Sequence, residues 1–123
     1  PSIALGIRMD DIGTYLIVSY DIKRIREWRA VFDSNLEDQA QYGIQVIFVA
    51  ERLAGPNPAY PYGITLVATV ANPDRAKQFM SEPRWAELGV LIGMDLASVK
   101  NSWATGRQAL IAQLQPMLRN DWV

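Results

Sequence analysis

Apolar and polar residues alternate with two different periods along this chain, and the period predicts where strands and helices lie. Residues 3–9 alternate strictly between apolar and small or polar side chains, which predicts a strand with one buried face. Residues 14–21, 44–51 and 63–71 are apolar on both parities or rich in β-branched residues, and residues 96–103 are predicted to close the sheet. The run 14–21 is expected to be the central strand.

Residues 23–42 change to the period of a helix. Trp28 and Phe32 fall four residues apart on one apolar stripe, and charged side chains lie on the opposite side. Gly43 follows in the position of a C-cap, where a left-handed backbone favours glycine. The sequence therefore predicts one long amphipathic helix after the central strand.

Three further helix starts are marked by capping residues. Residues 72–74, Asn-Pro-Asp, combine an N-cap, a proline suited to the first helical position and an acidic residue that complements the helix dipole. Residues 81–83 repeat a capping pattern and predict a short helix that ends near Gly89. Residues 105–108 fit a capping box and open a last helix, which Pro116 is expected to weaken.

The segment between the two middle strands, residues 53–62, holds three prolines, which excludes regular structure there. Its tyrosines and prolines suit either a lid over a cavity or a protein interface. No internal repeat, low-complexity tract or linker interrupts the chain. The sequence thus predicts a single α+β domain over residues 1–123, with a ferredoxin-like antiparallel sheet, helices on one face, an extra N-terminal strand and a C-terminal helix.

The composition excludes several classes of function. Lys and Arg number 12 against 13 Asp and Glu, so no overall field attracts nucleic acid or an acidic membrane surface. No apolar run approaches the ~20 residues that span a bilayer. Cysteine and histidine are absent, which removes thiol nucleophiles, thiolate metal sites and every role of imidazole. We therefore expect no cofactor, no metal, no nucleic-acid or membrane partner and, by default, a cytoplasmic location.

The order of the predicted elements and two stretches of local sequence resemble a known superfamily. Residues 26–33 (REWRAVFD), the following pair of strands, and residues 74–81 (DRAKQFMS) with Trp85 are similar to small proteins of the dimeric α+β barrel superfamily. This group includes the antibiotic-biosynthesis monooxygenases. The similarity covers about residues 15–103 and contains no catalytic signature.

The resemblance implies two subunits that pair their sheets into a barrel, with a ligand cavity in each subunit between sheet and helices. Members that bind haem through a histidine are poor matches, because this chain has no histidine. The resemblance therefore implies a cofactor-free oxygenase, cyclase or isomerase, or a protein of no known activity. Fold alone assigns no function.

Polar side chains beside the predicted cavity are the candidates for catalysis. Gln39 falls within the apolar helix stripe and Asn35 on its flank, where the amides either hydrogen-bond a substrate carbonyl or enolate or bond the backbone. Asp21 ends the central strand, as a general base or, more simply, as a helix N-cap. Tyr20 and Tyr62 either donate to an oxyanion or pack with satisfied hydroxyls. We assign the catalytic role to Asp21, Asn35 and Tyr62.

Aromatic side chains are the candidates for substrate binding. Trp28 and Phe32 lie on the helix stripe and Trp103 ends the last strand, so these three rings can line a cavity for an aromatic molecule. Core packing is the alternative and the commoner role for such residues. The residues assigned to substrate binding are Tyr20, Trp28, Phe32, Gln39 and Trp103.

Two functions follow from this pattern. The first is a cofactor-independent enzyme acting on a small apolar or aromatic metabolite. The second is a non-catalytic module that binds a small ligand or another protein, because no nucleophile and base form a recognisable pair. A converging carboxylate, amide and phenol in the cavity favours catalysis, whereas a wall of carbon alone favours binding.

A homodimer is also expected from the pattern of the strands. Several strands are apolar on both parities, so both faces of the sheet must be covered, and the helices of the minimal fold cover only one. Either a second copy of the chain or the terminal segments of the same chain must cover the other face. We expect the second copy.

Overall fold

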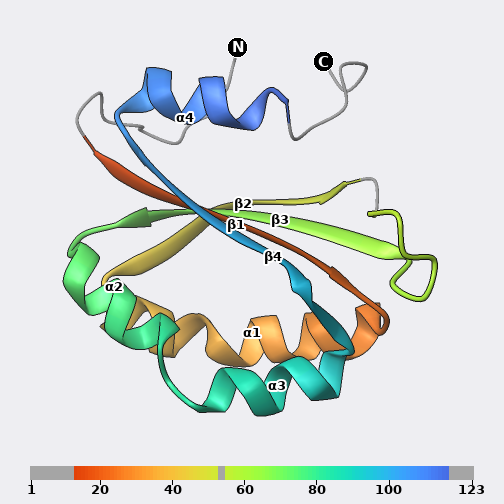
Figure 1. Ribbon diagram of the computed structural model, residues 1–123. Coiled ribbons are helices and arrows are strands. Elements are labelled where there is room, and N and C mark those ends of the chain that lie inside the picture. The colour runs from red at the N-terminus through yellow and green to blue at the C-terminus, as the bar shows by residue number, and fades with distance from the viewer. Residues whose placement is uncertain (1–12, 53–54, 117–123) are drawn as a thin grey trace.

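Four antiparallel strands and four helices make up the residues that the computed structural model describes, which are 13–52 and 55–116 (Figure 1). The sheet has the order β2-β3-β1-β4, with β2 at Ile44–Arg52, β3 at Tyr62–Val70, β1 at Thr14–Ile22 and β4 at Met94–Thr105. All three pairings are antiparallel. This order is that of a ferredoxin-like sheet, and the interior position of β1 confirms the predicted central strand. The strand predicted at residues 3–9 lies outside the described part of the chain.

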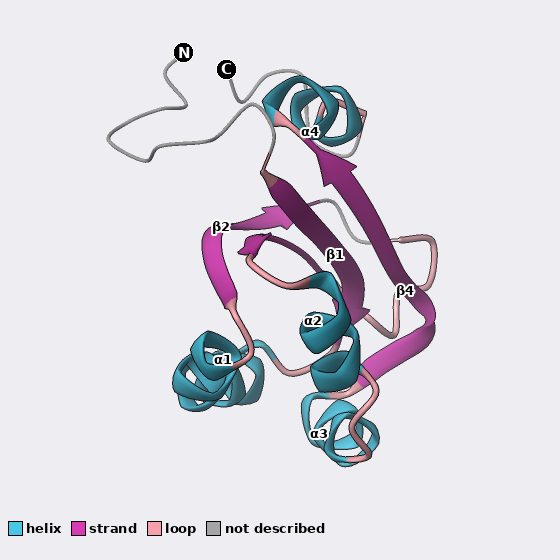
Figure 2. Cartoon of the chain, turned by 90° about the vertical axis from the view of Figure 1, so that its left-hand side faces the viewer, coloured by secondary structure: helices cyan, strands magenta, loops and turns pink. Residues whose placement is uncertain are grey.

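The helices cover both faces of the sheet, whereas the sequence predicted the main layer on one face (Figure 2). Helices α1 (Ile25–Gln41), α2 (Pro73–Met80) and α3 (Arg84–Ile92) lie together on one side. Helix α4 (Arg107–Leu114), which follows β4, lies on the opposite side of the sheet. The domain therefore has three layers over part of its area.

Alternation along β1 assigns its side chains to these two layers. Leu16 belongs to an apolar cluster that includes Phe79 of α2. Tyr20 belongs to another, which includes Trp28 of α1 and Ile92 of α3. Tyr15 and Ile17, of the opposite parity, pack against Leu110 of α4, and all three are 1% exposed. Helix α4 thus provides, within one chain, cover that the sequence analysis attributed to a second copy.

Two helix ends confirm the capping residues predicted for them. The Asn72 side chain accepts hydrogen bonds from the backbone N–H groups of Asp74 at 3.1 Å and Arg75 at 3.2 Å, at the start of α2. Gly43 follows α1 with a φ of 76°, a conformation that glycine adopts at little cost. Local sequence is sufficient to define both of these ends.

Two other predicted caps are wrong. The N-cap of α1 is Arg24, which makes no side-chain capping bond, so Asp21 is not the cap of this helix. The N-cap of α4 is Gly106, also without a side-chain bond, so residues 105–108 form no capping box. A capping residue type needs the matching backbone geometry, which these positions lack.

Helix α3 continues beyond its predicted end at Gly89 and stops before Gly93, which has a φ of 68°. The start of α1 is bonded to this end: the N–H groups of Lys23 and Arg24 donate to the carbonyls of Gly93 at 3.0 Å and Ile92 at 3.1 Å. The Arg24 guanidinium donates to two more carbonyls in the last turn of α3, at 3.2 and 3.1 Å. A cation at a helix C-terminus is favourable, so this junction holds α1 and α3 side by side.

We predict that Gly93→Ala destabilises the domain by about 1–2 kcal/mol, because a left-handed backbone strains an L-residue. The added Cβ would also lie 2.8 Å from Cβ of Lys23. Thermal unfolding followed by circular dichroism should show a fall in Tm of roughly 4–8 °C. The matched control is Gly89→Ala, whose Cβ meets only ordinary contacts at 3.8 and 4.0 Å and which favours the helix. Equal Tm values for the two variants would contradict the prediction.

Candidate functional site

A pocket of about 350 Å³ lies between the sheet and the inner faces of α1, α2 and α3. All four strands and these three helices contribute to its wall, and most of that wall is aliphatic or aromatic carbon. Among the described residues that line it, none carries a formal charge. Its volume is within the usual range for small-molecule sites, so the pocket has room for a small ligand.

Helix α1 contributes one continuous wall of this pocket. Trp28, Phe32, Asn35 and Gln39 all line it, because successive steps of four, three and four residues return to the same helix face. Trp28 and Phe32 stack, with ring centroids 5.2 Å apart and an interplanar angle of 17°. The wall is therefore aromatic in its first half and carries two carboxamides in its second.

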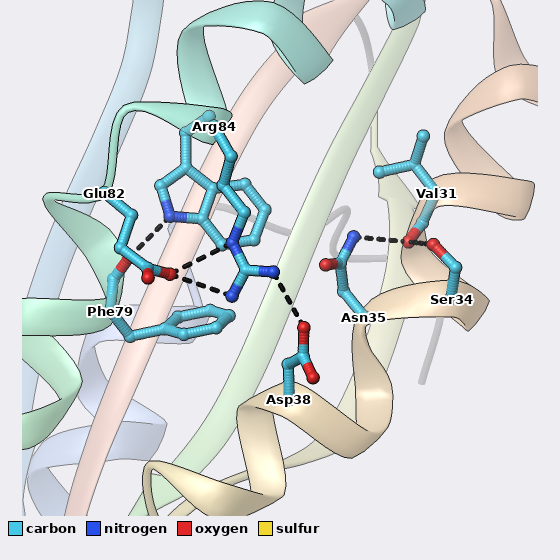
Figure 3. A network of polar contacts seen from close by, with 8 residues as sticks. Val31, Ser34, Asn35, Asp38, Phe79, Glu82 and Arg84 are labelled. Atoms are coloured by element: carbon cyan, nitrogen blue, oxygen red, sulfur yellow. Dashed lines mark hydrogen bonds and ion pairs between the residues drawn. The ribbon is translucent and has the colours of Figure 1, made fainter.

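Asn35 is a buried polar residue in this apolar wall, with 7% of its surface exposed. Its Nδ2 donates to the carbonyl of Val31 at 2.8 Å, which turns Oδ1 away from its own helix backbone (Figure 3). Exchanging the two amide atoms would bring two acceptor oxygens together, so this contact fixes the orientation. The pocket therefore contains an acceptor oxygen that a buried side chain holds in one direction.

Gln39 adds a second carboxamide one helical turn further along. Its Oε1 is buried and has no hydrogen-bond partner in the structure. A buried polar atom without a partner costs about 1–3 kcal/mol, and such atoms are uncommon in folded proteins. The second half of the wall thus has an unmet hydrogen-bonding group.

Tyr20 and Trp28 form a hydrogen-bonded pair at another point of the wall. The indole Nε1 donates to the Tyr20 hydroxyl oxygen at 2.7 Å. Burial raises the pKa of Tyr20 to about 12, against a smaller opposing effect of the hydrogen bond from Trp28. The phenol is therefore protonated at neutral pH, and its own hydrogen remains a donor.

Arg84 joins α1 to α3 beside the pocket. It donates to Asp38 of α1 at 2.7 Å and pairs with Glu82 at 2.8 Å (Figure 3). Its guanidinium also stacks on Phe79 and Trp85, two rings of the pocket wall, at 4.9 and 5.0 Å. The hydrogen bond to Asp38 raises the pKa of Arg84 further, so the group stays charged. The single cation and two carboxylates of this network neutralise one another only in part.

The structure brings together five of the eight side chains that the sequence assigned to a site. They come from β1 and from one face of α1, and all line the same pocket. These residues are Tyr20, Trp28, Phe32, Asn35 and Gln39.

The other three lie away from this wall. Asp21 has the parity of the opposite sheet face, and its carboxylate accepts from the N–H of Gly55 at 3.1 Å. Tyr62 begins β3 and packs at the end of the cluster that contains Tyr20. Trp103 lies in β4 beneath Lys77, whose Nζ is 5.6 Å from the ring centroid. The pocket therefore does not combine the carboxylate, amide and phenol of the predicted catalytic set.

Sequence reasoning placed only Trp103 of β4 at the cavity and missed the residues of β4 and α3 that line the pocket. Asn101 lines the pocket and lies two residues before Trp103, so its side chain points to the same face of the strand. Alternation along the strand could therefore have identified it. Leu88 and Ile92 line it from α3, and their position depends on how α3 lies across the sheet. That arrangement has no local signature.

Two classes of feature are missing from the described part of the chain. No group of three or more metal-ligating side chains occurs among these residues. No described helix has both the length and the hydropathy to cross a membrane.

Comparisons with known proteins give little that bears on the site. No protein-family model matches the chain, and no curated protein matches it in sequence. A solved structure that matches is the C-terminal domain of the MgtC protein from Mycobacterium tuberculosis, with 14% identity and a TM-score of 0.49. The match covers 84% of this chain and 97% of that domain. At this level of similarity it indicates nothing about a ligand.

The resemblance to the dimeric α+β barrel superfamily and its antibiotic-biosynthesis monooxygenases is therefore wrong. No family model matches the chain, and the solved structure described above is a domain of the MgtC protein, not a monooxygenase. The fold itself is α+β, with a four-stranded antiparallel sheet.

We predict that Gln39→Met stabilises the domain by about 1 kcal/mol, because it removes a buried acceptor without a partner and keeps the side-chain length. Gln41→Met is the matched control, since Gln41 is exposed on the same helix. Urea unfolding should show a higher midpoint for Gln39→Met and a change within about 0.5 kcal/mol for the control. A loss of stability in Gln39→Met would contradict this account of the pocket.

Proposed function

We propose that this domain reversibly binds a small, uncharged, mainly apolar or aromatic molecule in the pocket between its sheet and α1, α2 and α3. The observation that carries the proposal is a pocket of about 350 Å³ with an apolar wall and a few oriented polar groups. This combination is typical of small-ligand sites, in which carbon surface provides affinity and few hydrogen bonds provide orientation.

Binding is better supported than catalysis by the chemistry of the wall. General acid–base catalysis needs a group that exchanges a proton near neutral pH within reach of the substrate. The described pocket residues contain amides, indoles and the Tyr20 phenol, whose pKa burial raises to about 12. Asp21, which the sequence analysis assigned as base, has the parity of the other sheet face. The cofactor-independent enzyme is therefore the weaker of the two proposals.

We predict that N-phenylnaphthylamine, an uncharged fluorescent probe, binds saturably at one site per chain. Ala86→Trp should weaken this binding at least tenfold, because Ala86 is an exposed residue at the edge of the pocket and a large ring there obstructs entry. Ala40→Trp is the matched control, since Ala40 is exposed on α1 and does not line the pocket. Fluorescence titration provides the measurement. Absence of saturable binding, or equal affinity in all three proteins, would refute the proposal.

The homodimer expected from the sequence remains a proposal, and exposed apolar side chains support it. Val90 of α3 is 78% exposed and Leu96 of β4 is 73% exposed, next to the sheet edge that β4 forms. Large apolar side chains grouped at one edge are characteristic of association surfaces. This support is independent of the second sheet face, which α4 partly covers.

We predict that sedimentation at micromolar concentration gives a molecular mass of twice the 13.8 kDa of one chain. Val90→Glu should shift it to the monomer, because an uncompensated charge in an apolar interface is unfavourable. Val49→Glu is the control, at a residue 42% exposed on the opposite edge strand. Monomeric behaviour of the unmodified chain in analytical ultracentrifugation would exclude the dimer.

A further inference from the structure

The polar groups of the pocket wall restrict the chemical class of its ligand. Among the described residues that line the pocket, the second half of α1 offers two carboxamide oxygens, Oδ1 of Asn35 and Oε1 of Gln39. The two residues are four apart in the sequence, which is about 6 Å along a helix axis, so the donor of one ligand can reach either oxygen. Both oxygens are acceptors, and an acceptor is satisfied only by a donor.

The orientation of the Asn35 side chain determines that it offers an acceptor to a ligand. A freely rotating amide could offer either its oxygen as acceptor or its N–H groups as donors. Its Nδ2 is bonded to the carbonyl of Val31 at 2.8 Å, and the same carbonyl also accepts from the Ser34 hydroxyl at 2.9 Å (Figure 3). Turning the amide over would place Oδ1 against this carbonyl. The free atom that Asn35 presents is therefore the oxygen.

The charges near the wall disfavour an anionic ligand. The described lining residues carry no formal charge, so a buried carboxylate or phosphate would lack a counter-ion there. Arg84, whose guanidinium stacks on two rings of the pocket wall, is already paired with Asp38 and Glu82, at 2.7 and 2.8 Å. That network contains two carboxylates for one guanidinium, which adds a negative field.

The Tyr20 hydroxyl does not alter this conclusion. It is bonded to Trp28, and Trp28 precedes Asn35 by seven residues, which is about 10 Å along α1. The phenol is thus a separate polar point of the wall.

We propose that the ligand is an uncharged molecule with an apolar or aromatic body and a hydroxyl or N–H group, which donates to Oδ1 of Asn35 or to Oε1 of Gln39. This inference rests on the proposed binding function and narrows its ligand to hydrogen-bond donors. Phenols and alcohols of about ten to fifteen heavy atoms fit the available volume.

The test compares thymol with thymol methyl ether, which differ in the donor, and with para-isopropylbenzoate, an anion of similar size. Isothermal titration calorimetry gives the ratio of the two neutral affinities in the unmodified chain and in Asn35→Leu, which keeps the side-chain volume. We expect the preference for thymol over its ether to fall about tenfold in Asn35→Leu. Gln39→Met should reduce the preference in the same direction, and Gln41→Met, at an exposed position of α1 that does not line the pocket, should leave it within about twofold.

The outcomes separate this inference from the proposed function. If the fluorescent probe binds in the pocket and the ratio is the same in the unmodified chain and Asn35→Leu, the binding function stands and the donor inference is overturned. Tighter binding of para-isopropylbenzoate than of thymol also overturns it. If N-phenylnaphthylamine fails to bind saturably, the proposed function itself fails. Circular dichroism of each variant verifies that the fold is retained.

Discussion

The burial of β1 on both faces is the constraint on which the other elements depend. Its even-numbered side chains pack under α1, α2 and α3, and its odd-numbered side chains Tyr15 and Ile17 pack under α4. This strand also lies inside the sheet, where β3 and β4 pair with its two edges and β2 is left outside. The three-layer arrangement follows directly, because one helix layer cannot shield both faces of an apolar strand.

The pocket follows from how the helix layer is supported above the sheet. Near one end, Trp28 stacks on Phe32 and donates to Tyr20 of β1. Near the other, Phe79 contacts the rings of Tyr42 and Trp85, with centroids 5.0 and 4.9 Å away. Two groups of large rings hold the layers apart, while the strand residues between them, such as Val18 and Ala68, are too short to fill the gap. The hydrogen bonds and ion pairs that join α1 to α3 then keep the helix layer from closing over it.

The sequence predicted the strands, the long helix and the carboxamide-bearing wall because each depends on local periodicity. Asn35 and Gln39 were assigned from their positions on the helix stripe, and Asn72 and Gly43 from the backbone geometry that they favour. Asp21 was assigned to the site through its place at a strand end, but a strand alternates between faces, and its parity differs from that of Tyr20. The superfamily resemblance rested on apolar positions, which many domains with this order of elements share. The contribution of α3 to the pocket depends on long-range packing, which no short segment encodes.

The two carboxamides indicate why the pocket is more than a packing defect. A domain of this kind is stable by about 5–15 kcal/mol, so an orphaned acceptor that costs about 1–3 kcal/mol is a substantial loss. A methionine at position 39 would avoid that loss and would suit the surrounding carbon. The Gln39 Oε1 atom is buried, so the solvent does not hydrate it. A ligand with a donor group in this pocket would supply the partner that Gln39 Oε1 lacks, and binding would recover that cost.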